Sequence, residues 1–403
     1  DIVLTNTIDA DTSDWTVGGN WTISTSDAFP GVFTADTSTV TFNSGSTGKT
    51  IYSGGSSFYN IIFNNASGGW TLQEAMTVTN DFTVTNSDTT GSGVDLNGKA
   101  VNVTNDFSIN GGEVTAGAST ITIGGNWTNS GTFTYDTSTV ILTGASVALD
   151  TGGNATTKRF YNLQLTTAGQ TVTLTNQLAI QNVLTIGSTS GSKVTLTDGA
   201  SSYNLYLYKN TTAPIVFNRT HDVGYDITGI NSVYLQHTAD SVLSGGTYPT
   251  IYVTPSGAYT TTMAGDVTVG GTLYIFGNPA VGLTTLDTSS SNYALTVNGS
   301  LYLGIPPPPN GKLKANDSTI IVTGDVTIYG GFGGSEIDAD TSNWTVGGSW
   351  TNSGTFTADT STVTFAATDT DNTLTSGGSS FYNVIFSSGT YTLQDAFDVN
   401  GDL

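Results

Sequence analysis

The chain contains no cysteine, so no disulfide stabilises it. Small secreted domains usually need disulfides, whereas a long repeat protein builds enough apolar core without them, so the absence is compatible with an extracellular location. The chain also lacks any apolar run approaching roughly 18 residues, the length that a membrane-spanning helix requires. These absences predict a protein that does not insert into a membrane and that folds around its own core.

Positive charge is scarce. The chain has 9 basic and 31 acidic residues, which gives a formal net charge of −22. Only Lys158 and Arg159 place two basic side chains next to each other. Binding to nucleic acid or to anionic lipid needs clusters of Lys and Arg, so we expect neither partner. The surplus of Asp suits a mutually repelling surface, or one that collects divalent cations.

The apolar spacing of an amphipathic helix is also missing. What recurs is a short alternation of β-branched, Thr and aromatic residues, bounded by Gly, Asn, Ser and Asp, which is typical of strands and turns. Hydrophobic residues make up 36% of the chain and fall in these regular runs, so disorder is not expected. The sequence therefore predicts an all-β protein.

The clearest positive feature is an internal repeat. Ile8–Thr22 reads IDADTSDWTVGGNWT and Ile337–Thr351 reads IDADTSNWTVGGSWT, with two differences in fifteen residues. Further along, SGGSSFYN at Ser53–Asn60 returns at Ser376–Asn383. Residues 337–403 thus repeat residues 8–82. A chain that begins and ends within its own repeat is typical of an array in which stacked units bury each other's apolar faces.

A shorter motif fixes the fold. It consists of an apolar residue, a polar or glycine-rich triplet and a second apolar residue. Val78, Val103 and Ile123 begin copies that are 25 and 20 residues apart. Coils of 20–25 residues predict a parallel β-solenoid, in which each coil stacks on the last at about 4.8 Å. At roughly 22 residues per coil the chain would form about 18 coils. Tandem β-sandwich modules are the alternative, but their strands come every 8–12 residues or so.

The motifs weaken in the middle of the chain. We therefore predict β-solenoid coils at residues 1–208 and 272–403. Between them, residues 209–271 are interpreted as less regular, aromatic-rich coils or an insertion. No position in the chain looks like a domain linker.

Asn-x-Ser/Thr sequons, which accept N-linked glycans, are numerous. Asn-Trp-Thr recurs at a motif turn, where an acceptor would be accessible. A chain this rich in Asn, Ser and Thr also generates sequons by composition alone. The candidate glycosylation sites are Asn20, Asn65, Asn102, Asn126, Asn154, Asn210, Asn218, Asn298, Asn316 and Asn343.

Closely spaced carboxylates suggest a calcium site. Asp9, Asp11 and Asp14 alternate in the way that calcium loops do, and Asp338 and Asp340 echo them in the second copy of the repeat. The Gly and the distal Glu of an EF-hand loop are absent. Because Asp also favours turns, a purely structural role explains the same pattern. Ca²⁺ is the one cofactor that the sequence suggests.

An enzyme is the weaker hypothesis. Some β-helical proteins cleave polysaccharides with carboxylates and a basic residue, and the corresponding cluster here would be Arg219, His221, Asp222 and Asp226. Adjacent His and Asp residues in a loop are more often structural. No phosphate-binding loop, zinc spacing or nucleophile elbow is present. We therefore predict no catalytic residue and no enzymatic activity.

The repeat phrase itself carries a resemblance. GGNWTNSGTFTYDTSTV at Gly124–Val140, its near copy at Gly347–Val363 and the SGGSSFYN segments resemble repetitive surface and secreted proteins of environmental bacteria and archaea, similar to filamentous-haemagglutinin-type β-solenoid adhesins. The resemblance covers residues 8–200 and 290–403. It implies an extracellular or cell-surface fibre or adhesin, and it transfers no catalytic residue.

Together these observations predict an extracellular structural protein. Because a β-solenoid has open sheet edges at its ends, we expect copies to associate head to tail into a filament, or more repeats to continue it. The first alternative is an adhesin that binds a glycan or a host protein through residues 209–271. The second is the β-helical polysaccharide-degrading enzyme.

Overall fold

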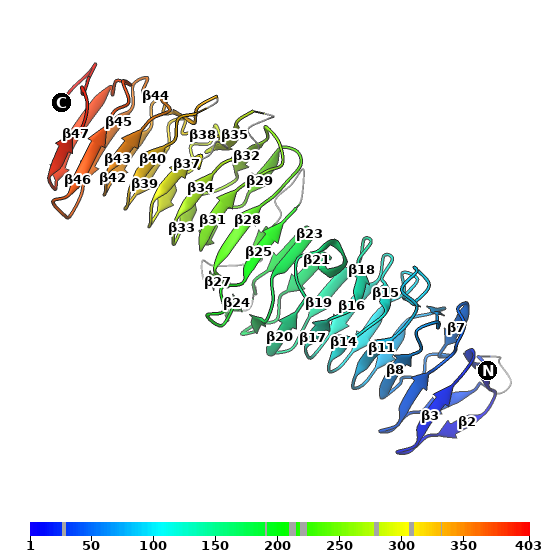
Figure 1. Cartoon of the computed structure of the whole chain (residues 1–403). Coiled ribbons are helices and arrows are strands. Elements are labelled where there is room, and N and C mark those ends of the chain that lie inside the picture. The colour runs from blue at the N-terminus through cyan, green and yellow to red at the C-terminus, as the bar shows by residue number, and fades with distance from the viewer. Residues whose placement is uncertain are drawn as a thin grey trace. The chain divides into compact units, whose positions relative to one another are not determined.

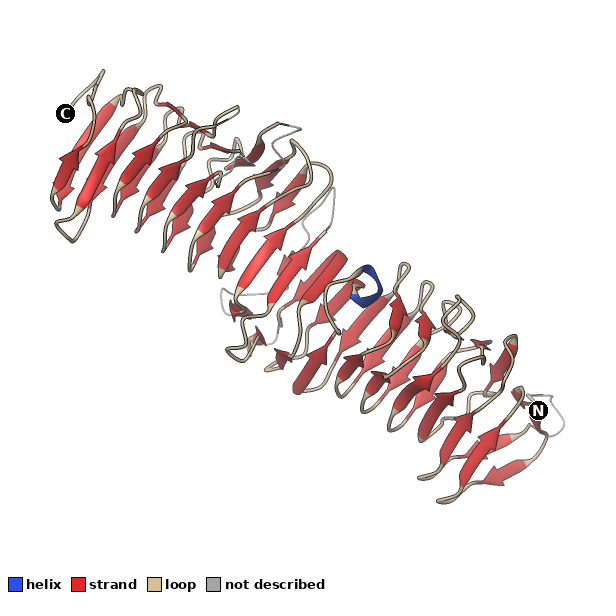
Figure 2. Cartoon of the chain, in the orientation of Figure 1, coloured by secondary structure: helices blue, strands red, loops and turns tan. Residues whose placement is uncertain are grey.

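A computed structural model describes residues 1–25, 30–189, 192–208, 215–217, 224–277, 282–305, 310–331 and 333–403. In these residues the regular secondary structure is almost entirely β-strand, and the one helical turn is the 3₁₀ helix η1 (Thr156–Lys158) (Figure 2). The strands stack in parallel as a β-solenoid of about 16 turns, which confirms the predicted fold. The expected number of about 18 was slightly high, because several coils are longer than the 22 residues assumed. Parallel pairing excludes the β-sandwich alternative, whose strands pair antiparallel.

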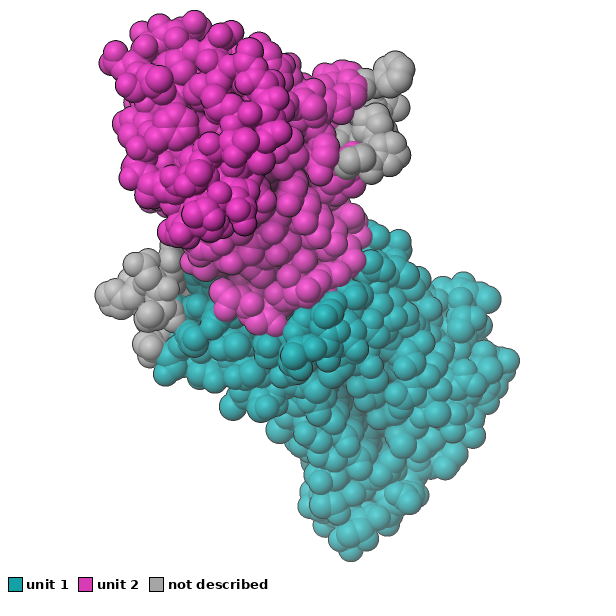
Figure 3. Space-filling view, turned by 60° about the vertical axis from the view of Figure 1, so that its left-hand side comes forward, with its two compact units in different colours: residues 1–203, 218–226 teal, residues 204–217, 227–403 magenta. Residues whose placement is uncertain are grey.

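The solenoid divides into two compact units (Figure 3). Unit 1 contains residues 1–203 and 218–226, and unit 2 contains residues 204–217 and 227–403. Part of the predicted irregular segment 209–271 lies outside the described residues. The described strands within it, such as β28 (Ser232–Leu235) and β31 (Thr250–Val253), pair in register like those elsewhere.

In unit 1 each coil contributes strands to faces that run along the stack (Figure 1). The first face contains β1 (Ile2–Leu4), β4 (Trp21–Ile23), β7 (Lys49–Tyr52), β9 (Trp70–Leu72), β12 (Val94–Asp95), β15 (Glu113–Thr115) and β18 (Thr132–Thr134). The second contains β3 (Asp14–Val17), β6 (Thr39–Phe42), β8 (Asn60–Asn64), β11 (Phe82–Asn86), β14 (Phe107–Ile109), β17 (Trp127–Asn129), β20 (Ser146–Asp150), β22 (Thr171–Leu174) and β24 (Val194–Thr197). The third contains β10 (Met76–Val78), β13 (Val101–Val103), β16 (Thr120–Ile123), β19 (Thr139–Leu142), β21 (Phe160–Leu165) and β23 (Leu178–Ile186), and β2 (Thr7–Asp9) pairs with β5 (Val32–Thr34).

Unit 2 is built in the same way. Its first face contains β25 (Asn204–Leu207), β28, β31, β34 (Leu273–Ile275), β37 (Leu301–Leu303), β40 (Val326–Ile328), β43 (Trp350–Asn352), β46 (Asn372–Thr375) and β48 (Tyr391–Leu393). The second contains β29 (Ser241–Leu243), β32 (Thr260–Met263), β35 (Thr284–Asp287), β38 (Gly311–Lys314), β41 (Glu336–Asp338) and β44 (Thr355–Thr357). The third contains β30 (Gly246–Tyr248), β33 (Val267–Val269), β36 (Leu295–Val297), β39 (Thr319–Val322), β42 (Asn343–Val346), β45 (Thr362–Ala366) and β47 (Asn383–Ser388). The remaining strands are β26 (Ile215–Phe217) and β27 (Tyr225–Gly229).

The core of each coil follows from strand alternation. In β16 the side chains of Ile121 and Ile123 point inward and are fully buried, while Thr120 and Thr122 face outward. The register of the parallel strands then places similar side chains of successive coils on top of each other. Phe82, Phe107 and Trp127 occupy one inward column, with ring centroids 4.5 and 4.9 Å apart and nearly parallel planes. Each coil therefore buries its apolar face only when a neighbouring coil covers it.

Polar side chains at one corner add a second link between coils. The Asp81 carboxylate accepts a hydrogen bond from the backbone N–H of Asp106 at 3.1 Å. The Asp106 carboxylate accepts from the N–H of Asn126 at 2.7 Å, and the Asn126 side chain accepts from the N–H of Ala148 at 2.8 Å. We call this the corner ladder. It explains why an Asp or Asn so often precedes the second apolar residue of the short motif.

Candidate functional site

The N-terminal end surface is the outer side of the first coil, around β1, β2 and β3. Val3 on β1 is 65% exposed, but it stands at an outward position of the strand, paired with Thr22 of the next coil. Trp15 on β3 is also partly exposed, whereas its counterpart in the second copy of the repeat, Trp344, is 1% exposed. Trp344 is covered by Ile320 of the preceding coil. No preceding coil covers Trp15 in the described residues.

The C-terminal end surface is the outer side of the last coil, around β47 and β48. Phe386 is 46% exposed, Leu393 is 51% exposed and Leu403 is 82% exposed. These are inward-type positions of the repeat, where a side chain is normally buried between coils. The surface therefore displays the unfinished core of a solenoid.

The first copy of the repeat shows what would cover the C-terminal end surface. Phe63, the counterpart of Phe386, is fully buried, because Phe82 of the next coil packs on it with the ring centroids 5.4 Å apart. Leu72, the counterpart of Leu393, is 1% exposed. The same motif is thus buried under the next coil in the first copy of the repeat and exposed in the second copy. The end surface fits the apolar side of one more β-solenoid coil.

The corner ladder points to the same kind of partner. Asp402 corresponds to Asp81, whose carboxylate accepts the N–H of Asp106 in the next coil. The N–H of Asp402 is itself held by the Asn383 side chain at 2.9 Å, so Asp402 occupies its place in the ladder. Its carboxylate is therefore placed to accept a backbone N–H from a further coil.

The aspartates predicted to bind calcium are turn and strand residues. Asp11 and Asp340 have φ values of 49° and 50°, the left-handed conformation that Asp tolerates in tight turns. The Asp9 carboxylate accepts the Asp11 N–H at 3.2 Å, and Asp338 forms an ion pair with Lys312 at 3.5 Å. Asp14 is exposed at the start of β3.

Carboxyl groups near the first of these turns interact with each other directly. A hydrogen bond with Asp9 raises the pKa of Asp36 above its usual range. In the described part of the chain, no three His, Cys, Asp or Glu side chains are arranged to hold a metal ion. The calcium hypothesis thus gains no ligand set from these residues.

The sequons occupy different environments. Asn102, Asn154, Asn298 and Asn343 are exposed, and Asn20, Asn65 and Asn126 are half-buried. Asn210 and Asn218 lie outside the described residues.

Burial separates one sequon, Asn316, from the others. Asn20 accepts the Thr50 N–H through its side-chain oxygen at 2.9 Å, which does not use the amide nitrogen that a glycan would need. Asn316 is only 8% exposed, and its amide nitrogen donates to Asp287 at 2.7 Å and to Thr288 at 3.0 Å. A glycan on Asn316 would break these contacts, so the exposed asparagines are the more accessible acceptors.

Of the cluster considered for catalysis, only one member is described. Arg219, His221 and Asp222 lie outside the described residues. Asp226 forms an ion pair with Lys193 at 2.7 Å. The structure thus provides no geometry for a catalytic arrangement of these four residues.

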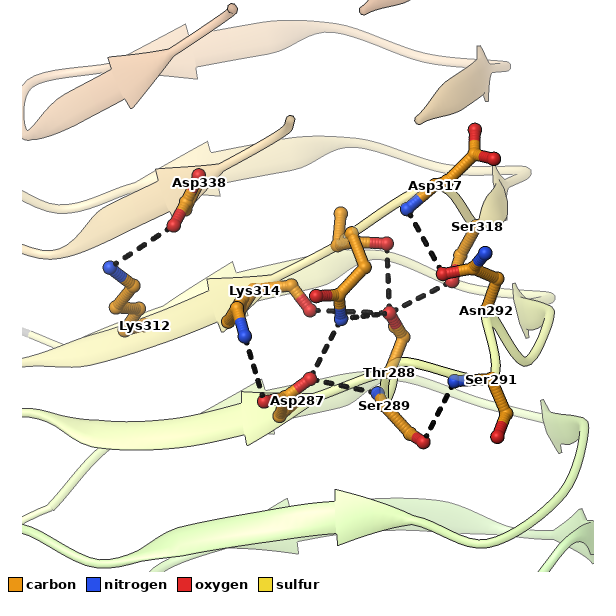
Figure 4. Close-up of polar contacts among 12 residues, drawn as sticks. Asp287, Thr288, Ser289, Ser291, Asn292, Lys312, Lys314, Asp317, Ser318 and Asp338 are labelled. Carbon is orange, nitrogen blue, oxygen red and sulfur yellow. Dashed lines mark hydrogen bonds and ion pairs between the residues drawn. The ribbon is translucent and has the colours of Figure 1, made fainter. Parts of the chain in front are cut away.

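A charged ladder joins β35, β38 and β41 on the outside of unit 2 (Figure 4). Lys312 contacts Glu336 at 2.8 Å, and Lys314 contacts Asp287 at 3.4 Å. Burial acts to lower the pKa of Lys312, but its hydrogen bond with Glu336 and the charges of Glu336 and Asp338 outweigh burial and raise it. Every described acid in the ladder faces a lysine, so we interpret the ladder as a link between coils rather than a binding site.

His237 is buried inside unit 2, at 2% exposure. Its Nδ1 is 2.7 Å from the Ala239 carbonyl and therefore donates, which leaves Nε2 to accept the Thr261 hydroxyl at 2.7 Å. Tyr259 lies beside the ring, with centroids 6.4 Å apart. Burial lowers the pKa of His237, although the Ala239 carbonyl and the Asp240 carboxylate oppose the shift.

This burial predicts a loss of stability in mild acid. Because the folded-state pKa of His237 lies below its unfolded value of about 6.5, the unfolded chain binds the proton more readily, and stability falls as the pH drops through that window. We expect His237→Gln to flatten the dependence of Tm on pH between about pH 7.5 and pH 5. Thermal melts of both proteins across this range would measure it, and identical slopes would contradict the prediction.

One exposed feature escaped the sequence analysis. Five outward-facing tyrosines share one register column on consecutive strands of unit 2, with ring centroids 4.4–5.2 Å apart. We call this column the tyrosine ladder: it consists of Tyr206, Tyr234, Tyr252, Tyr274 and Tyr302. The recurring apolar–Tyr–apolar triplet in LYL, VYL, IYV, LYI and LYL is the signal that could have found it.

Comparisons with known proteins add no family to this picture: no protein-family model, no curated protein and no solved structure matches the chain. Among the described residues there is also no helix with the length and apolarity needed to cross a bilayer. Only the surfaces of the molecule therefore indicate its function.

Proposed function

We propose that the protein is a structural subunit of an extracellular fibre, in which copies join head to tail through their solenoid ends. The observation that carries the proposal is the pair of matched motifs at the two ends. Phe386 is 46% exposed while its counterpart Phe63 is buried, and Trp15 is partly exposed while its counterpart Trp344 is buried. Each end thus presents the surface on which the other copy of the motif carries a coil.

The partner that best covers both ends is another copy of this chain. A stacked copy would pair its edge strands with β47 and β48 and would supply a backbone N–H to Asp402. Covering Phe386, Leu393 and Leu403 would contribute on the order of 3–5 kcal/mol, since full burial of such a side chain is worth about 1.5–3 kcal/mol. Backbone pairing along the edges adds to this and fixes the register.

The surface chemistry supports a fibre outside the cell. A net charge of −22 keeps the sides of neighbouring copies apart, so that association is favoured at the apolar ends rather than along the sides. The absence of cysteine leaves the assembly insensitive to the redox state of its surroundings. Exposed asparagines such as Asn102 and Asn298 would be accessible to glycosylation on the outside of such a fibre.

Electron microscopy of the purified full chain tests this proposal. We expect filaments one solenoid wide, with an axial layer spacing near 4.8 Å and a longer repeat of one chain. The same map would show whether Asn102 or Asn298 carries extra density. Single rods with free ends at high protein concentration would contradict end-to-end assembly.

A further inference from the structure

The tyrosine ladder lies on the outer face of unit 2, along β25, β28, β31, β34 and β37 (Figure 1). In each of these strands the tyrosine is half-buried and stands between two buried apolar residues, so its ring projects from the sheet. The five rings are nearly parallel, with interplanar angles of 3–19°. They form a straight row about 20 Å long at the coil spacing.

Stacking of the coils does not require this row. On the third face of unit 1 the outward column reads Thr77, Asn102, Thr122, Ile141 and Gln164, and these coils pair in the same parallel register. In unit 2 itself the column continues beyond Tyr302 with Thr327 and Thr351. The register column of tyrosines is thus confined to five consecutive coils, with Tyr329 stacked against its last member at a ring-centroid distance of 6.5 Å. An aromatic surface restricted in this way indicates a binding role.

The geometry of the row limits what it can bind. Because each ring covers the face of the next, the faces are occupied within the row, and the ring edges and hydroxyl groups remain for a ligand. Burial, the neighbouring phenols and a hydrogen bond with Tyr252 raise the pKa of Tyr234 to about 12, so its hydroxyl stays neutral and can both donate and accept. The row offers hydrogen bonds at regular intervals and no charge.

The side chains around the tyrosine ladder are likewise polar and uncharged. Beside the tyrosines runs a second column of small polar side chains, in which Ser232 is buried and the others are half-buried: Asn204, Ser232, Thr250, Thr272 and Ser300. None of the five strands contains Asp, Glu, Lys or Arg, in a chain whose net charge is −22. An anionic or cationic ligand would find no complementary charge on these strands.

We propose that the tyrosine ladder binds a neutral, linear polysaccharide that lies along the solenoid axis. One coil spacing of about 4.8 Å is close to the length of one extended hexose residue, so successive sugars meet equivalent hydroxyl groups on successive coils. An uncharged row of phenol and aliphatic hydroxyl groups matches a polymer that presents only hydroxyl and ether oxygens. The inference does not depend on filament assembly, because the whole row lies within one chain.

Native affinity electrophoresis of the full chain tests the inference, with an unbranched soluble β-glucan in one gel and polygalacturonate, an acidic polymer, in another. We expect the glucan alone to retard the protein. The variant carrying Tyr252→Thr and Tyr274→Thr should bind roughly tenfold more weakly or worse, since it loses at least two hydrogen bonds. Thr is the residue that continues the same column at Thr327, so the variant should keep the fold, which circular dichroism would check.

A matched control removes two stacked tyrosines elsewhere. Tyr135 and Tyr161 in unit 1 have ring centroids 6.4 Å apart, and Tyr135→Thr with Tyr161→Thr should leave retardation by the glucan unchanged. The inference is overturned if the glucan fails to retard the wild type. It is also overturned if the ladder variant and the control variant bind the glucan equally. A third contrary outcome is that the ladder variant differs from the wild type only in side-by-side association of the protein in the absence of the glucan.

Discussion

Replacing Phe386 and Leu393 together by Asp is expected to abolish filaments and to leave single solenoids. These side chains are 46% and 51% exposed at the C-terminal end surface, and their counterparts in the first copy of the repeat are buried by the next coil. A second copy seated on this surface would have to bury two carboxylates without partners, at a cost of several kcal/mol each. Each loss of about 1.4 kcal/mol in binding free energy lowers the association constant tenfold, so the critical concentration for filament assembly should rise at least about a hundredfold.

Sedimentation and electron microscopy of the variant would measure this effect. The control is Thr296→Asp with Thr345→Asp, which adds the same charge to the outer face of β36 and β42 without touching the end. The control should assemble like the wild type. If both variants assembled normally, the C-terminal end surface would not be the contact; if both failed, added charge rather than loss of the end contact would be responsible.

Replacement of Phe107 by Ala is expected to cost about 3–5 kcal/mol of stability in unit 1, the range found for deletion of a large buried aromatic ring. Phe107 is fully buried between Phe82 and Trp127, with ring centroids 4.5 and 4.9 Å away. Its loss leaves a cavity that both neighbouring coils line. Because a solenoid is stabilised by contacts between adjacent coils, the damage should weaken pairing on both sides of β14.

Urea unfolding followed by tryptophan fluorescence would show this loss as a lower midpoint. Ser108→Ala changes the adjacent outward side chain of the same strand, and its effect should stay within about 0.5 kcal/mol. A shift for Phe107→Ala no larger than that of Ser108→Ala would contradict the packing described for this column.

The spacing of apolar residues in the sequence was sufficient to predict the fold. A motif such as Val78-TND-Phe82 places two inward apolar residues around a tight corner, and its return at 20–25 residues leaves few alternatives to a parallel stack. The repeat also identifies equivalent positions directly, such as Phe58 and Phe381 within SGGSSFYN. This worked because alternation and coil length are local properties that a single sequence displays directly.

The roles of particular polar residues were harder to predict. Calcium binding by Asp11 and Asp340 stays a prediction from the sequence, whereas the left-handed turn conformation that each adopts depends on backbone geometry. Asn316 has the same sequon pattern as Asn298, yet burial against Asp287 separates it from the exposed acceptors. Neither the turn conformation nor the burial can be derived from the spacing of residues in the sequence.

What the sequence determined by itself is the stack: strand alternation, coil length and the equivalence of the two copies of the repeat. The tertiary structure decided which equivalent residues are covered and which side chains meet across coils. Phe63 and Phe386 occupy the same place in the repeat and differ only because a coil lies on one of them. The tyrosine ladder likewise depends on strand register. Its members are 18–28 residues apart in the chain and become neighbours when successive coils stack.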